Sequence, residues 1–297
     1  MKVKRMVLVI GGNGYIGSRI TELFVRDNID YSILDTKEDM HQNHYYVGNI
    51  LDKDSLKTAV SMADTVLYLA GAHLSNYEQN YDFLIKGLLN CLELCREYHV
   101  KRFIYASNGA VYSDIDGRKT CAEEDDVCSE EVEKTYSSLI CRAERLLQNE
   151  AERENMRCVI LRIGEVYGPG IYNPCSKKSV SLLGDGSSVS SKIHITDFIN
   201  ILYKIILDSR IEGVFNICDC CPVEQITFYQ YIKEHNRDFL IKLSEYDGTN
   251  ERLYWSIFGL RTLNINMSNE KICKVLKYDF VYKTYREGLN SLFSDVG

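Results

Sequence analysis

The feature that most constrains the fold is a glycine-rich run near the start of the chain, Gly11-Gly12-Asn13-Gly14-Tyr15-Ile16-Gly17. The aliphatic stretch from Met6 to Ile10 precedes this run, as is typical of a strand buried on both faces. Apolar residues follow it at helical spacing: Ile16, Ile20, Leu23 and Phe24. A strand, a glycine turn and a helix in this order predict a dinucleotide-binding turn, in which a pyrophosphate approaches the backbone at the positive end of the helix.

An acidic residue stands about twenty positions beyond the glycines, at the spacing expected of a dinucleotide site. The stretch from Tyr31 to Leu34 predicts a second strand, and Asp35 follows it directly. A carboxylate at this place binds the ribose hydroxyls of NAD and repels the 2′-phosphate of NADP. We therefore expect NAD as the cofactor, while the nearby Lys37 keeps NADP as the alternative.

Composition excludes several classes of protein. The chain has 297 residues, of which 45% are hydrophobic, and this suits one large α/β domain or a nucleotide domain with a smaller lobe. Its net charge of -7 argues against a nucleic-acid or membrane partner. We find no signal-peptide pattern and no apolar run near the ~18 residues of a membrane span, so we expect a cytoplasmic protein.

The chain has 11 cysteines, and most of them are isolated in the sequence. An odd number of scattered cysteines indicates reduced thiols. Cys218, Cys220 and Cys221 form the one cluster, but no second ligand pair stands at zinc spacing from them. We therefore predict no metal site.

Strand-like and helical segments alternate along the first half of the chain. The expected strands are Val7 to Ile10, Tyr31 to Leu34, Tyr45 to Val47, Thr65 to Leu69, Phe103 to Ala106 and Cys158 to Ile163. The expected helices include Glu78 to Tyr98, Ser129 to Glu152, Thr196 to Leu207, Thr227 to Glu234 and Asn269 to Leu276. This alternation predicts an α/β protein with a Rossmann-type, doubly wound parallel sheet. We expect a nucleotide domain over residues 1–164, whose core continues into later segments, and an interleaved, smaller substrate lobe over 165–297.

Separate motifs along the chain stand in a family's characteristic order. They are Gly11-xx-Gly14-xx-Gly17, Gly48-Asn49-Ile50-Leu51-Asp52, Leu69-Ala70-Gly71-Ala72, Tyr105 through Tyr112, Tyr136 with Glu144, Leu161 through Gly170, Gly184-Asp185-Gly186 and Ile193 through Asp197. With these motifs the chain resembles the extended short-chain dehydrogenase/reductase family, in its NAD-dependent epimerase/dehydratase group. The resemblance extends over nearly the whole chain.

The resemblance implies the residues that hold the cofactor. The turn residues Gly11, Asn13, Gly14, Tyr15, Ile16 and Gly17 would line the pyrophosphate, and Asp35 would bind the adenosine ribose. Asn49 and Ile50 would contact the adenine, with Asn49 in place of the family's usual Asp. Leu69, Ala70 and Gly71 would face the middle of the cofactor, and Tyr136 would lie at the nicotinamide.

The expected catalytic group is incomplete. In the family a tyrosine transfers the proton, and a lysine four residues later lowers the pKa of that tyrosine. Tyr136 matches the tyrosine, but Ile140 stands where the lysine is expected. An unperturbed phenol with a pKa near ~10 is less than ~1% ionised at pH 7, so the isoleucine removes part of the acid-base chemistry.

Four more pocket positions depart from the family pattern. Asn108 takes the place of the catalytic Ser/Thr, with Ser107 one position earlier. Leu84 replaces a helix Asn, Glu165 replaces an Asn, and Ser190 replaces the Arg that contacts a nucleotide diphosphate. Glu165 is a candidate base or cation-binding group, or else a solvated loop acid. We also expect His73 to be a possible ligand contact, His194 to be a packed core residue and Glu123 to Asp126 to be an acidic loop over the cleft.

Two classes of function follow. The first is an NAD-dependent epimerase, dehydratase or ketoreductase of a sugar nucleotide or another hydroxylated metabolite, with Tyr136, Asn108, Ser107 and Glu165 as candidate catalytic residues. The second is a catalytically degenerate NAD-binding sensor, or a protein that stabilises a partner. The resemblance further implies a possible homodimer, which would pair the helices that contain Leu84 to Cys95 and Leu139 to Leu147.

Overall fold

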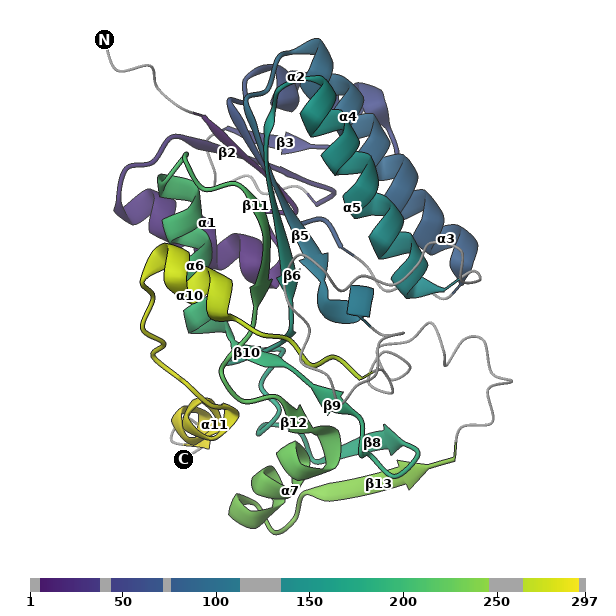
Figure 1. The fold of residues 1–297 in the computed structure, drawn as a ribbon, viewed down its shortest axis with the longest axis vertical. Coiled ribbons are helices and arrows are strands. Elements are labelled where there is room, and N and C mark those ends of the chain that lie inside the picture. The colour runs from purple at the N-terminus through teal and green to yellow at the C-terminus, as the bar shows by residue number, and fades with distance from the viewer. Residues whose placement is uncertain (1–5, 38–43, 72–75, 113–134, 246–263, 294–297) are drawn as a thin grey trace.

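The computed structural model describes residues 6–37, 44–71, 76–112, 135–245 and 264–293 (Figure 1). The expectations for His73 and for the acidic run from Glu123 to Asp126 lie outside these residues. Within the described part of the chain, no helix is both long enough and apolar enough to cross a membrane.

The centre of the molecule is a seven-stranded sheet in the order β11-β6-β5-β4-β1-β2-β3. Every neighbouring pair in this sheet is parallel. The strands are β1 (Val7–Ile10), β2 (Tyr31–Asp35), β3 (Tyr45–Val47), β4 (Thr65–Tyr68), β5 (Arg102–Asn108), β6 (Arg157–Ile163) and β11 (Gly213–Ile217). The order reverses direction at β1, so the predicted doubly wound fold is confirmed.

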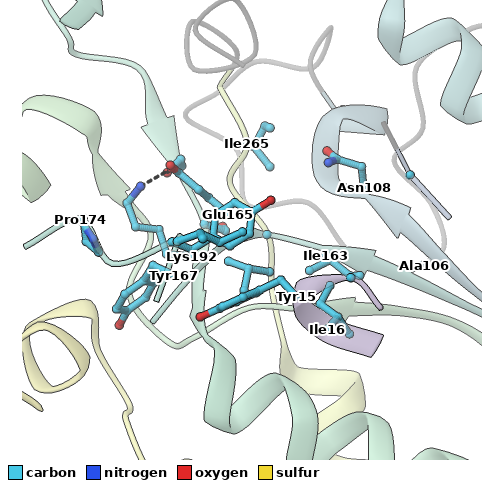
Figure 2. A pocket seen from close by; sticks show the side chains of 18 of the residues that line it. Tyr15, Ile16, Ala106, Asn108, Ile163, Glu165, Tyr167, Pro174, Lys192 and Ile265 are labelled. Carbon is cyan, nitrogen blue, oxygen red and sulfur yellow. Dashed lines mark hydrogen bonds and ion pairs between the residues drawn. The ribbon is translucent and has the colours of Figure 1, made fainter. Parts of the chain in front are cut away.

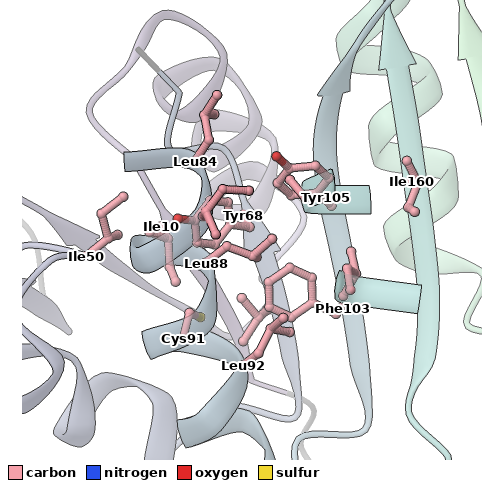
Figure 3. Close-up of a cluster of buried hydrophobic side chains, with 14 of the residues drawn as sticks. Ile10, Ile50, Tyr68, Leu84, Leu88, Cys91, Leu92, Phe103, Tyr105 and Ile160 are labelled. Atoms are coloured by element: carbon pink, nitrogen blue, oxygen red, sulfur yellow. The ribbon is translucent and has the colours of Figure 1, made fainter. Parts of the chain in front are cut away.

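Helices cover both faces of the sheet, because successive strand residues point to opposite sides. Leu8 and Ile10 belong to one apolar cluster, which joins the sheet to α2 (Lys53–Ser61), α4 (Gly87–Glu97) and α5 (Tyr136–Arg153). Figure 3 shows part of this cluster, in which strand residues such as Tyr68 and Phe103 lie beside Leu88 and Leu92 of α4. Val7 and Val9 belong to a second cluster on the other face. That cluster includes residues of α1 (Tyr15–Arg26), α6 (Ile195–Leu207) and α10 (Glu270–Leu276).

Two of the predicted helices differ from the structure in detail. The segment expected as one helix from Glu78 consists of α3 (Tyr77–Tyr81), a π-helical turn (Asp82–Lys86) and α4. Of the helix expected over Ser129 to Glu152, the first part, residues 129–134, lies outside the described residues, and the described helix α5 begins at Tyr136. Thr135 is its N-cap, since the Thr135 side chain accepts from the Ser138 N–H and the Ser138 side chain caps in return.

A smaller lobe lies beyond the carboxyl ends of the strands. It contains β7 (Glu165–Tyr167), β8 (Ser179–Leu183), β9 (Val189–Ser190), β10 (Lys192–His194), β12 (Val223–Glu224), α7 (Gln225–His235), β13 (Leu240–Ser244) and α11 (Tyr285–Phe293). Three two-stranded pairs build it: β7 with β10, β8 with β13, and β9 with β12. The chain leaves this lobe to add α6 and β11 to the main sheet and then returns, so the two parts are interleaved in sequence.

Most of the described cysteines are free, as expected. Eight of the described cysteines are free thiols. Cys141 is disulfide-bonded, so the expectation of reduced thiols is wrong at this position. Among the described residues, no group of three His, Cys, Asp or Glu side chains is placed to hold a metal ion.

Candidate active site

The glycine turn between β1 and α1 leaves no room for side chains. Gly11 has a φ of +86°, a conformation that favours glycine. A Cβ on Gly17 would lie 2.4 Å from the Gly11 carbonyl oxygen, so only glycine lets the helix start against the turn. Gly14 caps α1 with no side chain, and the first turn of the helix contains no acidic residue. The helix therefore begins with backbone N–H groups suited to an anion, and this fits the pyrophosphate of a dinucleotide.

Asp35 ends β2 beside this turn. Its carboxylate accepts hydrogen bonds from the backbone N–H groups of Asn13 at 3.0 Å and Thr36 at 2.8 Å. The Asn13 amide in turn donates to the Tyr45 hydroxyl at 2.7 Å. These contacts hold the carboxylate next to the glycine turn, where the sequence predicts the ribose. Tyr45, on β3, has no signal in the sequence that marks it as part of this corner.

A cavity of about 770 Å³ lies between the sheet and the smaller lobe (Figure 2). Its walls include most of the predicted cofactor residues: Gly11, Gly14, Tyr15, Ile16, Gly17, Leu69, Ala70, Gly71 and Tyr136. The volume is in the range of small-molecule sites, ~300–1,000 Å³. The cavity thus joins the predicted nucleotide turn to the predicted catalytic residues.

Asn49 and Ile50 lie outside the walls of this cavity. The Asn49 side-chain oxygen accepts from the Leu51 N–H at 3.0 Å, while Ile50 is buried in the core. A Cβ on Gly87 would lie 2.6 Å from the Ile50 side chain, which shows how closely α4 packs on it. The contact of these two residues with an adenine stays a prediction.

The five pocket positions at which the chain departs from the family pattern all line the cavity. They are Leu84, Asn108, Ile140, Glu165 and Ser190. Ser107 and Tyr136 also line the cavity, so all four predicted catalytic residues are among its lining residues. The structure therefore brings every predicted catalytic residue to one place, although their roles remain predictions.

Tyr136 is the first residue of α5 and is buried. Burial raises the pKa of its phenol above the ordinary value. Ile140, one helical turn later, is also buried and supplies no charge that would oppose this shift. Tyr136 consequently keeps its proton at neutral pH.

Asn108 ends β5 and begins the tight turn Gly109–Tyr112. Its side-chain oxygen accepts a hydrogen bond from the Ala110 N–H at 2.8 Å. Because the oxygen is used in this way, the amide NH₂ is the group left to donate to a ligand. Asn108 can thus polarise a substrate oxygen, but an amide does not relay a proton as a hydroxyl does.

Ser107 lines the cavity and also takes part in a buried polar network. Its hydroxyl donates to the Glu144 carboxylate at 2.5 Å. Glu144 also accepts from the Arg162 guanidinium at 2.8 Å, and both side chains are only 4% exposed. Arg162 donates to the Tyr112 hydroxyl at 2.7 Å, which donates to Asn216. The network ties β5, β6, β11 and α5 together beneath the cavity, so it supports a structural role for Ser107.

Glu165 is in an ion pair with a lysine that the sequence did not single out. The Lys192 ammonium lies 2.5 Å from its carboxylate (Figure 2). The Gln225 amide donates to the same carboxylate oxygen at 3.2 Å. All three residues line the cavity, from β7, β10 and α7. The lysine and the glutamine stand 27 and 60 positions after Glu165, so no local pattern could have linked them.

His194 is packed in the core, as expected. It is buried between the rings of Tyr167 and Tyr282, and its Nδ1 accepts from the Thr196 N–H at 3.2 Å. Burial lowers the pKa of His194 to about 4. The imidazole is therefore neutral and structural.

The chain is similar to known proteins in sequence and in fold. A curated relative, dTDP-D-glucose 4,6-dehydratase of Dictyostelium discoideum, is 26% identical over 253 residues, which cover 71% of this chain and 57% of the relative. The UDP-glucose 4-epimerase of Thermus thermophilus, solved with NAD, superposes with a TM-score of 0.76 at 19% identity, covering 97% of this chain and 99% of that one. MoeE5, solved with UDP-glucuronic acid and NAD, gives a TM-score of 0.75 at 21% identity and covers 98% and 99%.

These structural likenesses show the shared fold, and the chain spans somewhat more than half the length of the first curated relative. The family itself is shown by a sequence model, the NAD dependent epimerase/dehydratase family, which matches residues 7–218. This confirms the predicted resemblance, and with it NAD as the family's cofactor. The chain belongs to the NAD dependent epimerase/dehydratase family.

Proposed function

We propose that this chain is an NAD-dependent epimerase or dehydratase of a sugar nucleotide, in which Tyr136 is the proton donor. The observation that carries the proposal is the shared cavity: Tyr136 and Asn108 lie on the same walls as the glycine turn and the segment Leu69 to Gly71. A phenol and an amide donor therefore stand together beside the place where the cofactor would lie. The relatives' activities support the same class of reaction.

The residues of the nucleotide half would bind and orient the cofactor. The N–H groups at the start of α1 would hold the pyrophosphate, and Asp35 would hold the adenosine ribose. When bound, NAD supplies the hydride acceptor of the family's chemistry. Gly11, Gly14 and Gly17 fit this use because side chains there would occupy the space against the turn.

The residues of the catalytic half would handle the substrate oxygen. Tyr136 carries its proton at Oη at neutral pH, because burial raises its pKa and Ile140 provides no opposing charge. It is therefore suited to protonate a carbonyl oxygen, and less suited to remove a hydroxyl proton. The Asn108 NH₂ would donate a second hydrogen bond to that oxygen.

A catalytically degenerate NAD-binding protein is the second candidate. Ile140 favours it, since a buried isoleucine occupies the place of the family's lysine on the cavity wall. The two candidates differ in what they predict for turnover, and they agree on cofactor binding.

A direct experiment separates them. The purified protein would be examined for bound NAD or NADH by absorbance and then assayed with a panel of sugar nucleotides. Turnover that Tyr136→Phe abolishes supports the enzyme, whereas bound NAD without turnover in any condition supports the degenerate protein. Ile140→Lys provides a second comparison, since a cation one turn from Tyr136 would increase its ionised fraction.

The homodimer and the cytoplasmic location remain proposals. Apolar residues of the helices expected to pair, among them Leu88, Leu92 and Leu147, are buried within the chain itself. Leu89 on α4 is 37% exposed and is available for contact with a second copy. Light scattering of the purified protein would measure the oligomeric state.

A further inference from the structure

The Glu165, Lys192 and Gln225 cluster lies in the cavity on the side of the smaller lobe. Glu165 and Lys192 are directly opposite each other in the parallel pair of β7 and β10. Gln225 reaches them from the first position of α7. Three separate elements therefore place these side chains together, and the arrangement is built into the lobe.

Lys192 is held by the protein on several sides. Its ammonium lies 2.5 Å from the Glu165 carboxylate, 3.4 Å from the Gln225 side-chain oxygen and 4.2 Å from the centre of the Phe228 ring. An ammonium has three N–H donors, and a carboxylate, an amide oxygen and an aromatic face are all suitable acceptors. The Lys192 side chain is only 1% exposed. Lys192 therefore pairs with Glu165 and acts through it as a positioning residue.

Glu165 is the member of the cluster that a substrate would meet. Its side chain is 26% exposed, against 1% for Lys192. Ser190 lies within 3.4 Å of the same carboxylate oxygen that Lys192 and Gln225 contact. Because the ammonium of Lys192 is buried and the carboxylate of Glu165 is partly exposed, a ligand in the cavity meets the carboxylate side of this ion pair.

We propose that Glu165, positioned by Lys192 and Gln225, selects neutral or amino-substituted hexosyl groups and rejects hexuronosyl groups. This inference rests on the proposed function. A carboxylate accepts hydrogen bonds from hydroxyl and ammonium groups, while it repels a second carboxylate brought next to it. MoeE5, which has the same fold, was solved with UDP-glucuronic acid, so the fold itself accommodates a uronate. The choice must therefore come from side chains such as Glu165.

The test uses two substrates that differ only at C6, UDP-glucose and UDP-glucuronate. Their binding to the NAD-loaded protein is measured by calorimetry, and kcat/KM is measured where turnover occurs. The wild-type protein should favour UDP-glucose. Glu165→Gln should shift the ratio of the two substrates toward UDP-glucuronate at least about tenfold, because it removes the repelling charge and leaves Lys192 uncompensated.

Two more variants separate a change in substrate preference from a loss of folding. Glu165→Gln combined with Lys192→Met removes both charges, so it should also weaken the discrimination while leaving no buried ammonium unpaired. Glu270→Gln removes a carboxylate from the Glu270–Lys274 pair, whose side chains are each 75% exposed on α10, and should leave the ratio unchanged.

The inference is overturned if the wild-type protein prefers the uronate, or if the ratio stays the same in both Glu165 variants. An equal gain in affinity for both substrates would also overturn it. The two substrates share the diphosphate and differ only at C6, so such a result would mean that the charge of Glu165 acts on the diphosphate. If the wild-type protein holds NAD but binds neither sugar nucleotide, the proposed substrate class itself fails. That outcome is visible before any variant is made.

Discussion

The backbone N–H of Ala110 donates a 2.8 Å hydrogen bond to the side-chain oxygen of Asn108. This bond determines which end of the amide is available at the cavity, because the oxygen already has its partner. By the resemblance, Asn108 stands where the family has a Ser or Thr. This chain therefore has an oriented NH₂ donor at the position of the family's hydroxyl. In the proposed function, this NH₂ would donate a hydrogen bond to a substrate oxygen and would not relay a proton.

Asn108→Asp tests this role. The aspartate keeps the size of the side chain and an oxygen for Ala110, but it replaces the NH₂ donor with an acceptor. Loss of one donor to a developing oxyanion costs about 10²–10³ in kcat, so we expect a decrease of that order. Asn108→Ser, which restores a donor, should keep more activity. Steady-state kinetics would contradict the role if Asn108→Asp turned over at the wild-type rate while binding NAD normally.

Gly17→Ala should disrupt the nucleotide turn. The new Cβ would lie 2.4 Å from the Gly11 carbonyl oxygen and 2.6 Å from the Gly12 Cα, and backbone atoms cannot move aside cheaply. We expect a loss of stability of about 1–3 kcal/mol and weaker NAD binding. Gly71→Ala is the matched control for stability, because its nearest neighbour is 4.0 Å away. Urea unfolding with and without NAD measures both effects, and equal stabilities of the two variants would refute the close approach.

Glu144→Gln should be strongly destabilising. The glutamine leaves the buried Arg162 guanidinium without its carboxylate, at a cost of about 3–5 kcal/mol. A double variant with Arg162→Met should regain part of that loss. Glu270→Gln, from the exposed pair with Lys274, should change the free energy of unfolding by no more than about 1 kcal/mol. A similar small effect at Glu144 would show that the buried network contributes little.

Asp219 should make stability fall as pH rises. The residue is buried, and burial raises its pKa from 3.8 to about 7. One of its carboxylate oxygens has no hydrogen-bond partner within the described part of the chain. The folded state therefore binds more protons than the unfolded state between these pKa values, so unfolding becomes easier with rising pH. His194 acts in the opposite direction, since burial lowers its pKa from 6.5 to about 4 and stability is lost as pH falls below 6.5.

Asp219→Asn removes the first of these two effects. The variant should be more stable than the wild type above pH 7 by up to about 4 kcal/mol, with little difference near pH 4. Between those limits its stability should rise with pH, because the contribution of His194 is then no longer opposed by Asp219. The midpoints of urea unfolding, measured across this pH range, test the prediction. It is wrong if the midpoints of the two proteins depend on pH in the same way.

The main sheet could be predicted because its signals are local. Buried strands read as short aliphatic runs, and the glycine turn with Asp35 requires particular residues at particular positions. The ends of helices are harder to predict where a cap determines them. Thr135 and Ser138 together start α5, but the same residue types also occur in loops.

The smaller lobe could not be predicted in the same way. Its pairs join segments far apart in sequence, such as β8 with β13, and the partly exposed strand β13 lacks a clear alternating pattern. The ion pair between Glu165 and Lys192 could not be predicted for the same reason, because it depends on the pairing of β7 with β10. The resemblance marked Glu165 as unusual, and only the structure showed what it contacts.

The turnover of Tyr136→Phe, with bound NAD measured in the same samples, tests most directly whether Tyr136 donates a proton in a cavity that also binds NAD. Tyr68→Phe is the control, because Tyr68 is a buried tyrosine outside the cavity walls. We predict that Tyr136→Phe keeps NAD and loses about 10²–10⁴ in kcat, while Tyr68→Phe keeps both. Turnover by Tyr136→Phe equal to that of the wild type would contradict the claim.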